Sequence, residues 1–163
     1  MVTRQWHFQH DAGRPFAETS AELIAAYPAE AELIRAFGAR WLETFAGPTA
    51  GTHAIVQALA DAQVPQFAIT NFSAEFWQIF QPTAPILQIF RDVIISGREH
   101  LVKPDPAIFA LARQRFALGD GDAVFIDDNA ANVDAARDAG WHGIHFRTAP
   151  QLRRDLRQLG FAL

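Results

Sequence analysis

The sequence has 163 residues, half of them hydrophobic, which suits one globular domain of ordinary size with a small appended part. The formal net charge is −4 and there is no long basic run, so we expect neither a nucleic acid nor a membrane as a partner. The absence of cysteine excludes disulfides, thiol nucleophiles and cysteine metal sites. The N-terminal segment has neither a signal-peptide core nor a membrane-spanning run, so the expected location is cytoplasmic.

The first third of the chain has a helical pattern. Residues 1–15 form a polar segment that we expect to be mobile, with Asp11 in a loop. His7 and His10 have a spacing found in metal sites, but no third ligand follows them, so a metal role is not favoured. From about residue 15 to 45, apolar residues recur at helical spacing with a break near Pro28. This pattern predicts two helices.

After residue 51, helix-like and strand-like segments alternate. Near-continuous apolar strands that alternate with helices indicate a parallel sheet covered by helices on both faces, a doubly wound α/β fold. The predicted strands are FAIT (67–70), DVIIS (92–96), AVFID (123–127) and HGIHF (142–146), and the predicted helices cover about residues 55–62, 73–80, 104–116, 130–139 and 152–159.

Three successive predicted strands end on polar residues that could share one site. The first is followed by Thr70 and Asn71, the second leads into the loop with Lys103, and the third ends on Asp127 and Asp128. In parallel sheets, ligands bind at the carboxyl ends of the strands. A hydroxyl and an ammonium can hold anionic oxygens, and carboxylates hold Mg²⁺. The combination therefore favours a phosphate group bound together with a divalent cation.

Each of these features also has an ordinary structural explanation. Thr and Asn at a strand-to-helix turn commonly cap the helix, and a lysine before Pro-Asp-Pro is commonly a solvated loop residue. Capping explains one acid better than two adjacent acids, because like charges resist burial beside a strand. The conjunction of all three features, in this order, is more specific than any one of them.

Three motifs, ITN (69–71), VKPDPAIF (102–109) and FIDDNAANVDAARDAG (125–140), resemble the second, third and fourth motifs of the haloacid-dehalogenase-like (HAD) hydrolase superfamily. The resemblance covers essentially the whole chain. It implies a Rossmann-like core over residues 48–163. Residues 1–47 are similar to part of the helical cap found in the phosphatase-like branch.

The resemblance also implies roles for the motif residues. Thr70, helped by Asn71, would hydrogen-bond the phosphoryl oxygen of a small phosphorylated metabolite. Lys103 would neutralise the phosphate and the nucleophile. Phe72 follows this loop directly, and we expect it to face the substrate, whereas the other aromatic residues are expected to pack in the core.

The acid pair is implied to form part of a magnesium site. Asp128 would be the direct Mg²⁺ ligand, Asp127 would support the metal or the lysine, and Asn132 would lie at the trailing polar position. Haloacid dehalogenases proper need no metal and resemble a pattern with serines at these two places. The acid pair therefore favours phosphatase chemistry over dehalogenase chemistry.

The first motif of the superfamily, a strand ending in Asp-x-Asp whose first Asp is the nucleophile, is missing from this sequence. Asp11 has neither an apolar strand before it nor an acid two residues later. By the resemblance, that strand lies in the middle of the sheet, beside the strands that end at Thr70 and Asp127. An upstream segment lost through a misplaced start or a truncation is the favoured explanation.

Loss of this strand has structural and chemical consequences. It leaves two strand edges with unpaired backbone groups, which are costly and prone to aggregation. Re-pairing of the two flanking strands, a homodimer or another edge-strand partner would each cover these edges. Without a nucleophile, the remaining groups can bind phosphate and magnesium but cannot form the covalent intermediate, so the catalytic competence of the chain is doubtful.

Two further hypotheses place the chain in a class other than the hydrolases. One is a non-catalytic relative that binds phosphate or a partner protein through the remaining motifs. The other, a more distant alternative, is a signalling receiver domain, which also uses an acid pair, a Thr and a Lys around magnesium. In receivers the acid pair comes first, whereas here Thr70 and Lys103 precede Asp127 and Asp128, and this order argues against a receiver.

Overall fold

The computed structural model describes residues 2–163 and divides them into two compact units. Unit 1 contains the chain up to Gly47 together with Thr70–Pro85 and Ile94–Val102. Unit 2 contains Pro48–Ile69, Ile86–Val93 and Lys103–Leu163. The end of the predicted cap at residue 47 coincides with the end of the first segment of unit 1, and unit 1 also includes two segments of the predicted core.

The elements follow the predicted alternation of helices and strands over most of the chain. The strands are β1 (Phe67–Thr70), β2 (Asp92–Ile95), β3 (Val124–Asp127) and β4 (His142–His145). The α-helices are α1 (Arg4–Asp11), α2 (Phe16–Ala26), α3 (Ala31–Ala39), α4 (Thr52–Asp61), α5 (Ala74–Phe80), α6 (Ser96–Glu99), α7 (Pro106–Phe116), α8 (Ala130–Asp138) and α9 (Ala149–Gln158). Short 3-10 helices cover Pro28–Glu30, Trp41–Thr44, Gln81–Thr83 and Pro85–Ile89.

The N-terminal segment forms the helix α1, whereas the sequence predicts a polar, mobile segment. Thr3 caps α1, since its side chain accepts a hydrogen bond from the backbone N–H of Trp6 at 3.1 Å. Trp6 and His10, one helical turn apart, are both buried. Asp11 is the last residue of α1 and not a loop residue. The apolar periodicity of this helix is weak, because one of its two buried residues is a histidine.

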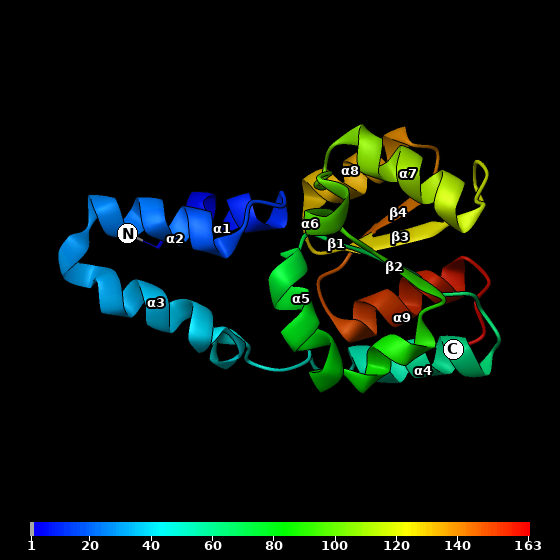
Figure 1. Ribbon diagram of the computed structural model, residues 1–163. Coiled ribbons are helices and arrows are strands. Elements are labelled where there is room, and N and C mark those ends of the chain that lie inside the picture. Colours follow the sequence, from blue (N-terminus) through cyan, green and yellow to red (C-terminus); the bar gives the residue numbers. More distant parts are fainter. Residues whose placement is uncertain (1) are drawn as a thin grey trace. The chain divides into compact units, whose positions relative to one another are not determined.

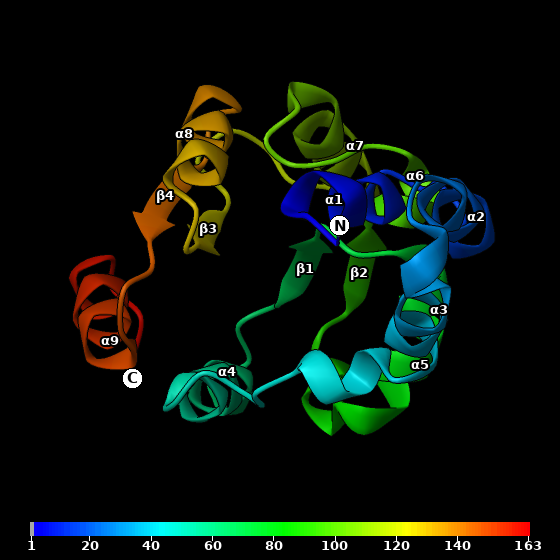
Figure 2. The same cartoon turned by 90° about the vertical axis from the view of Figure 1, so that its left-hand side faces the viewer.

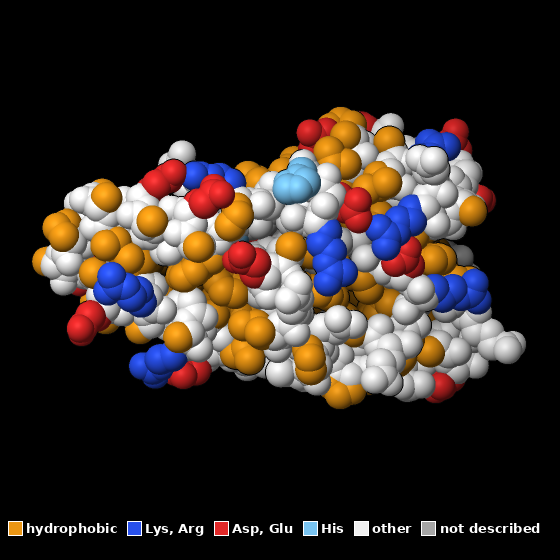
Figure 3. Space-filling model, viewed as in Figure 1, with side chains coloured by type: hydrophobic (Ala, Val, Ile, Leu, Met, Phe, Trp, Pro, Cys, Tyr) orange, Lys and Arg blue, Asp and Glu red, His pale blue; other side chains and the backbone are white. Residues whose placement is uncertain are grey.

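Unit 1 is held together by α1 packing against α2. The indole Nε1 of Trp6 donates to the carbonyl of Thr19 at 3.1 Å, and Nε2 of His10 lies 2.6 Å from the Thr19 hydroxyl. Thr19 and His10 are each only 1% exposed. The surface of α2 and α3 remains partly apolar (Figure 3), with Tyr27 and Leu33 among its exposed side chains.

Unit 2 is layered around the β3–β4 pair. The two strands are parallel, with Val124 opposite His142 and Asp127 opposite His145. Helices α7 and α8 cover one face of this pair, and α4 and α9 cover the other (Figure 1). Apolar side chains from α4, β4 and α9 form the buried core on the second side: Ile55, Leu59, Ile144, Leu152 and Leu156.

The four strands form two separate two-stranded sheets, β1–β2 and β3–β4. Within unit 2, a cavity of about 840 Å³ is lined by Phe67–Ile69 of β1 on one side and by all of β3 on the other. Figure 2 shows β1 standing apart from the β3–β4 pair. The flanking strands therefore do not re-pair, and the first remedy suggested by the sequence is wrong. The four predicted strands of the α/β fold are present, and they form two short sheets.

None of the helices within residues 2–163 is long and apolar enough to cross a lipid bilayer.

The buried histidine predicts a pH dependence of stability. Burial, followed by the charges of His7 and Arg14, lowers the pKa of His10 from 6.5 to about 4. As the pH falls through 6.5, the unfolded chain gains a proton that the folded chain does not accept until about pH 4. The free energy of unfolding should therefore fall by about 1 kcal/mol per pH unit over this window, and by about 3 kcal/mol in total.

Urea unfolding of wild type and His10→Gln from pH 7 to pH 4 measures this effect. The variant should lose most of the slope, whereas His53→Gln, on an exposed position of α4, should retain it. Asp11, whose pKa burial raises, titrates in all three proteins, so the comparison isolates His10. Equal slopes in wild type and His10→Gln would contradict the assignment.

Candidate functional site

Asp127 lies at the carboxyl end of β3 and is held by three other parts of unit 2. Its Oδ2 accepts from Nζ of Lys103 at 2.7 Å, and Nδ2 of Asn132 donates to both carboxylate oxygens at 3.1 Å. The backbone N–H of Asn129 donates to Oδ1 at 2.8 Å. The carboxylate is therefore hydrogen-bonded on both oxygens, which offsets part of the cost of removing it from water.

The Lys103–Asp127 ion pair is largely shielded from solvent. The two side chains are 11% and 8% exposed, respectively. Nζ of Lys103 also lies 5.6 Å from the centre of the Phe125 ring, within the range of a cation–π contact. Asp105 caps the following helix α7 by accepting from the N–H of Ala107 at 2.8 Å, which fixes the loop that carries the lysine. Lys103 is therefore not a solvated loop residue.

Asp128 differs from Asp127 in its exposure and in its hydrogen bonding. The residue is exposed, and its carboxylate has no hydrogen-bond or ion-pair partner among residues 2–163. Its backbone carbonyl accepts from Nε2 of His145 at 3.0 Å, which ties this turn to the end of β4. The exposed carboxylate thus has lone pairs available to a hard cation.

The donor set fits magnesium bound mainly through water. In the described part of the chain, no three His, Asp or Glu side chains converge closely enough to hold a metal ion. Mg²⁺ commonly binds through one or two carboxylates and keeps several waters or substrate oxygens. Asp128 supplies one such carboxylate. The Asp127 carboxylate is paired with Lys103. Buried Asn132 orients Asp127 through its Nδ2, and the Oδ1 of Asn132 has no hydrogen-bond partner among the described residues.

The second strand end of the predicted site belongs to unit 1. Thr70 is the last residue of β1, and its hydroxyl has no partner within the described residues. The backbone N–H of Phe72 donates to the hydroxyl of Ser96 at 2.9 Å, and that hydroxyl donates to the carbonyl of Asp11 at 2.6 Å. Ser96, which sequence reasoning missed, therefore ties the turn after Asn71 to the end of α1. Its position as the last residue of a predicted strand was the available signal.

The Phe72 ring packs into an aromatic cluster of unit 1. Its centre lies 5.3 Å from that of Trp41 and 5.2 Å from those of Trp77 and Phe80. Trp41 in turn stacks on Phe76 at 4.6 Å with nearly parallel rings. These contacts give Phe72 a packing role in unit 1, and its role toward a substrate stays a prediction.

Asp11 is a second residue near this turn that the sequence did not reveal. Burial raises the pKa of its carboxyl group, while His7 and a hydrogen bond from the backbone N–H of Ser73 act in the opposite direction. The carboxyl group therefore lies at the start of α5, directly after Phe72. No strand pattern or acid pair precedes it in the sequence, so only the packing of α1 could place it there.

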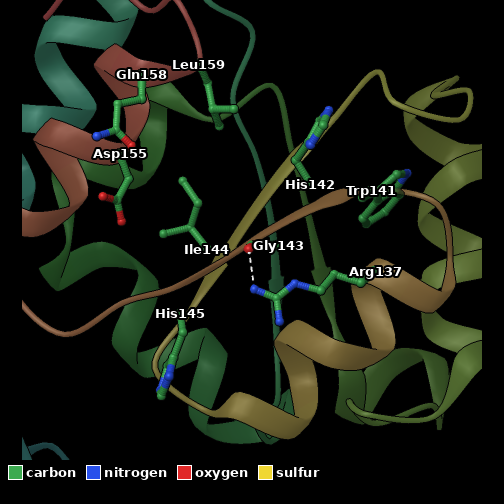
Figure 4. A pocket seen from close by; sticks show the side chains of 9 residues that line it. All are labelled: Arg137, Trp141, His142, Gly143, Ile144, His145, Asp155, Gln158 and Leu159. Atoms are coloured by element: carbon green, nitrogen blue, oxygen red, sulfur yellow. Dashed lines mark hydrogen bonds between the residues drawn. The ribbon is translucent and has the colours of Figure 1, made fainter.

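Another cavity of unit 2 has a different character. It has a volume of about 510 Å³ and lies where α8, β4 and α9 meet (Figure 4). Arg137, one of its lining residues, already donates to the carbonyl of Gly143 at 2.8 Å and to Asp134 at 2.8 Å. None of the predicted site residues lines it.

The shielded ion pair should contribute strongly to stability. Asp127→Asn leaves the Lys103 ammonium without its carboxylate in a water-poor position, so we expect a loss of about 3 kcal/mol in the free energy of unfolding. Lys103→Met should cost a similar amount, and the double variant should cost about 1–3 kcal/mol less than the sum. Urea unfolding of the four proteins measures this coupling.

The exposed pair of Arg40 and Glu43 provides the matched control. Glu43→Gln removes a solvent-exposed ion pair and should change stability by less than about 1 kcal/mol. Costs at Lys103 and Asp127 that simply add, or that match the surface control, would show that the pair is not coupled.

Comparison with curated proteins finds relatives of partial length. The chain is 33% identical over 113 residues to acyl-CoA dehydrogenase family member 10 of Mus musculus, covering 69% of this chain and 10% of the relative. It is 27% identical over 110 residues to the chloroplast flavin mononucleotide hydrolase 1 of Arabidopsis thaliana, covering 68% of this chain and 44% of the relative. The chain thus spans less than half the length of either protein.

A solved structure and a family model agree on the fold. A HAD family enzyme from Bacteroides thetaiotaomicron superposes with a TM-score of 0.76 at 16% identity, covering 94% of this chain and 78% of that one. The family model described as haloacid dehalogenase-like hydrolase matches residues 3–140. That match contains all of the motif residues described above. The chain therefore belongs to the haloacid dehalogenase-like hydrolase family.

Proposed function

We propose that this chain carries the site of a magnesium-dependent phosphohydrolase that acts on small phosphorylated metabolites. The observation that carries the proposal is the shielded Lys103–Asp127 pair beside the free carboxylate of Asp128, at the carboxyl end of β3. An ammonium attracts a phosphoryl group, and an adjacent free carboxylate attracts the cation that accompanies it. Few other ligands need both charges at one strand end.

The residues of unit 2 would each have a different role in this site. Asp128 would hold magnesium, which when bound withdraws negative charge from phosphoryl oxygens. Asp127 would keep the Lys103 ammonium directed at the strand end, and Asn132 would keep Asp127 in place through its two hydrogen bonds. Lys103 would attract and orient the phosphoryl group. Its ion pair limits the rotamers that the lysine can adopt, so less entropy is lost on binding.

The relatives support phosphate esters as the substrate class. The Arabidopsis relative is a flavin mononucleotide hydrolase by name, and flavin mononucleotide is a phosphate monoester. Two adjacent acids at Asp127 and Asp128 support the same chemistry over dehalogenation. Thr70 and Asn71, at the end of β1, would bind the phosphoryl oxygens by hydrogen bonds. These roles are proposals for this chain.

A non-catalytic phosphate-binding protein is the second candidate. The printed sequence contains no Asp-x-Asp after an apolar strand, so residues 2–163 offer no carboxylate in the place of the family's nucleophile. Lys103, Asp128 and the phosphate-binding turn could still bind ligand without breaking a covalent bond. Both candidates predict that these residues alone bind ligand without turnover. Turnover after a nucleophile-bearing strand is supplied would favour the hydrolase.

Magnesium should stabilise the protein through Asp128. Ligand that binds only the folded state raises the melting temperature by mass action, so a magnesium concentration about ten times Kd should raise it by about 3 °C. Asp128→Asn should abolish the increase, and a chelator should reverse it. Asp138→Asn, which removes an exposed acid from α8, is the matched control and should respond like wild type. An equal response of all three proteins would refute the metal site.

Phosphate binding can be followed at a single atom because Lys103 is the one lysine in the sequence. In protein with ¹³C-labelled lysine, its εCH₂ signal should shift on titration with riboflavin 5′-phosphate and magnesium. Riboflavin, which lacks the phosphate, should cause no shift, and Asp128→Asn should need about tenfold more ligand. An unchanged signal at millimolar phosphate ester would contradict the assignment of Lys103.

A further inference from the structure

His145 connects β4 with the candidate site. It is the last residue of β4 and lies opposite Asp127 in the parallel pairing of β3 with β4. Its side chain is partly buried, and its Nε2 lies 3.0 Å from the backbone carbonyl oxygen of Asp128. Figure 4 shows the His145 ring at the end of β4, beside the turn into α8. The imidazole thus contacts the backbone of the proposed magnesium ligand.

This contact determines which ring nitrogen of His145 carries a hydrogen. A carbonyl oxygen can only accept a hydrogen bond, so Nε2 must carry the hydrogen and donate it to Asp128. In the neutral ring, Nδ1 is then the nitrogen without a hydrogen. The imidazole therefore acts on Asp128 as a donor whose position is set by β4.

The peptide group between Asp128 and Asn129 is held at both of its polar atoms. Its carbonyl oxygen accepts from Nε2 of His145 at 3.0 Å, and its N–H donates to Oδ1 of Asp127 at 2.8 Å. Because a peptide group is planar and rigid, it cannot turn about the chain direction without breaking one of these two bonds. Its orientation is therefore fixed by β3 through Asp127 and by β4 through His145.

The chain on either side of Asp128 is fixed as well. Asp127 is the last residue of β3. Asn129 caps α8, since its side chain accepts from the N–H of Ala131 at 3.0 Å. Asp128 thus lies between two anchored residues, and the direction of its side chain depends on the peptide group that follows it.

The direction of this side chain matters for a hard cation. Mg²⁺ requires a nearly ideal octahedral arrangement of oxygen ligands. A carboxylate on a backbone that is already ordered loses less conformational entropy when it binds than one on a mobile turn. Residues that hydrogen-bond behind a metal ligand commonly provide this order. The exposed carboxylate of Asp128 has no partner of its own within residues 2–163, so its order must come from the backbone.

From these contacts we infer that His145 is a positioning residue of the magnesium site: by donating to the carbonyl of Asp128, it fixes the direction in which that residue presents its carboxylate. The inference rests on the proposed function, because it takes Asp128 as the magnesium ligand. It adds β4 to the elements that build the site. Magnesium affinity should therefore depend on a hydrogen-bond donor at the place of the His145 Nε2.

Two substitutions separate the hydrogen bond from the loss of the ring. In His145→Gln, the amide nitrogen is as many bonds from Cβ as Nε2 and can donate to the same carbonyl, whereas in His145→Asn it is one bond closer and falls short. Magnesium chloride is titrated into ¹⁵N-labelled protein, and the backbone amide signal of Asn129 gives Kd. His145→Asn should bind magnesium about tenfold more weakly than wild type, and His145→Gln should stay within about threefold. His142→Asn, at an exposed position of the same strand, should bind like wild type.

Two further measurements use protein without magnesium. In wild type with a neutral His145 ring, ¹⁵N spectra should place the ring hydrogen on Nε2. The backbone amide hydrogen of Asn129 should exchange with solvent about fivefold faster in His145→Asn than in wild type or His145→Gln, because the peptide group has lost one of its two bonds.

The outcomes distinguish this inference from the proposed function. If wild type binds magnesium and His145→Asn binds it equally well, or if His145→Gln is weakened as much as His145→Asn, the inference is overturned and the metal site stands. A ring hydrogen on Nδ1 alone would also overturn it, and that spectrum needs only wild type, so the test holds even if neither variant folds. A wild type that does not respond to magnesium would overturn the metal site and this inference with it.

Discussion

The carboxylate of Asp127 is the group on which much of unit 2 depends. It accepts hydrogen bonds from the Lys103 ammonium, the Asn132 amide and the backbone N–H of Asn129. Those donors come from the loop before α7, from α8 and from the turn between β3 and α8. The buried Asp127 carboxylate therefore fixes three segments at one strand end. Each segment supplies part of the hydrogen bonding that the carboxylate requires. The same arrangement leaves Asp128 free.

The different roles of the two adjacent acids follow from where β3 ends. Asp127 is the last residue of the strand, whereas Asp128 already belongs to the turn that leads into α8, so the two side chains have different environments. One is drawn into the packed loop and paired, and the other is left in solvent with its lone pairs available. A site that needs both a fixed cation and a free ligand for a second cation is well served by such a pair.

The strands of this chain do not form one sheet. β1–β2 and β3–β4 are two separate sheets, and a cavity lies between β1 and β3. The backbone groups of Val124 and Ile126 that face this cavity have strong hydrogen-bonding requirements. Asp127 and Asp128 also line this cavity, so it reaches the candidate site. The unpaired edge of β3 and the candidate site therefore border the same cavity.

The sequence by itself determined the local features. The strands at 67–70, 92–95 and 124–127 and the helices after them could be predicted because apolar periodicity and turn residues are encoded locally. The acid pair and Lys103 could be proposed as site residues because strand ends converge in parallel sheets. Helix α1 and the position of Asp11 could not be predicted. The buried face of α1 includes His10, a polar residue whose burial is supported by the contact between its Nε2 and the Thr19 hydroxyl.

Only the tertiary structure decided which acid is paired, because neighbours in sequence cannot reveal that Lys103 and Asn132 both reach Asp127. It also decided that the flanking strands stay apart. Hydrogen bonding between strands far apart in the chain depends on how the helices on both faces pack, and that packing is a property of the whole fold.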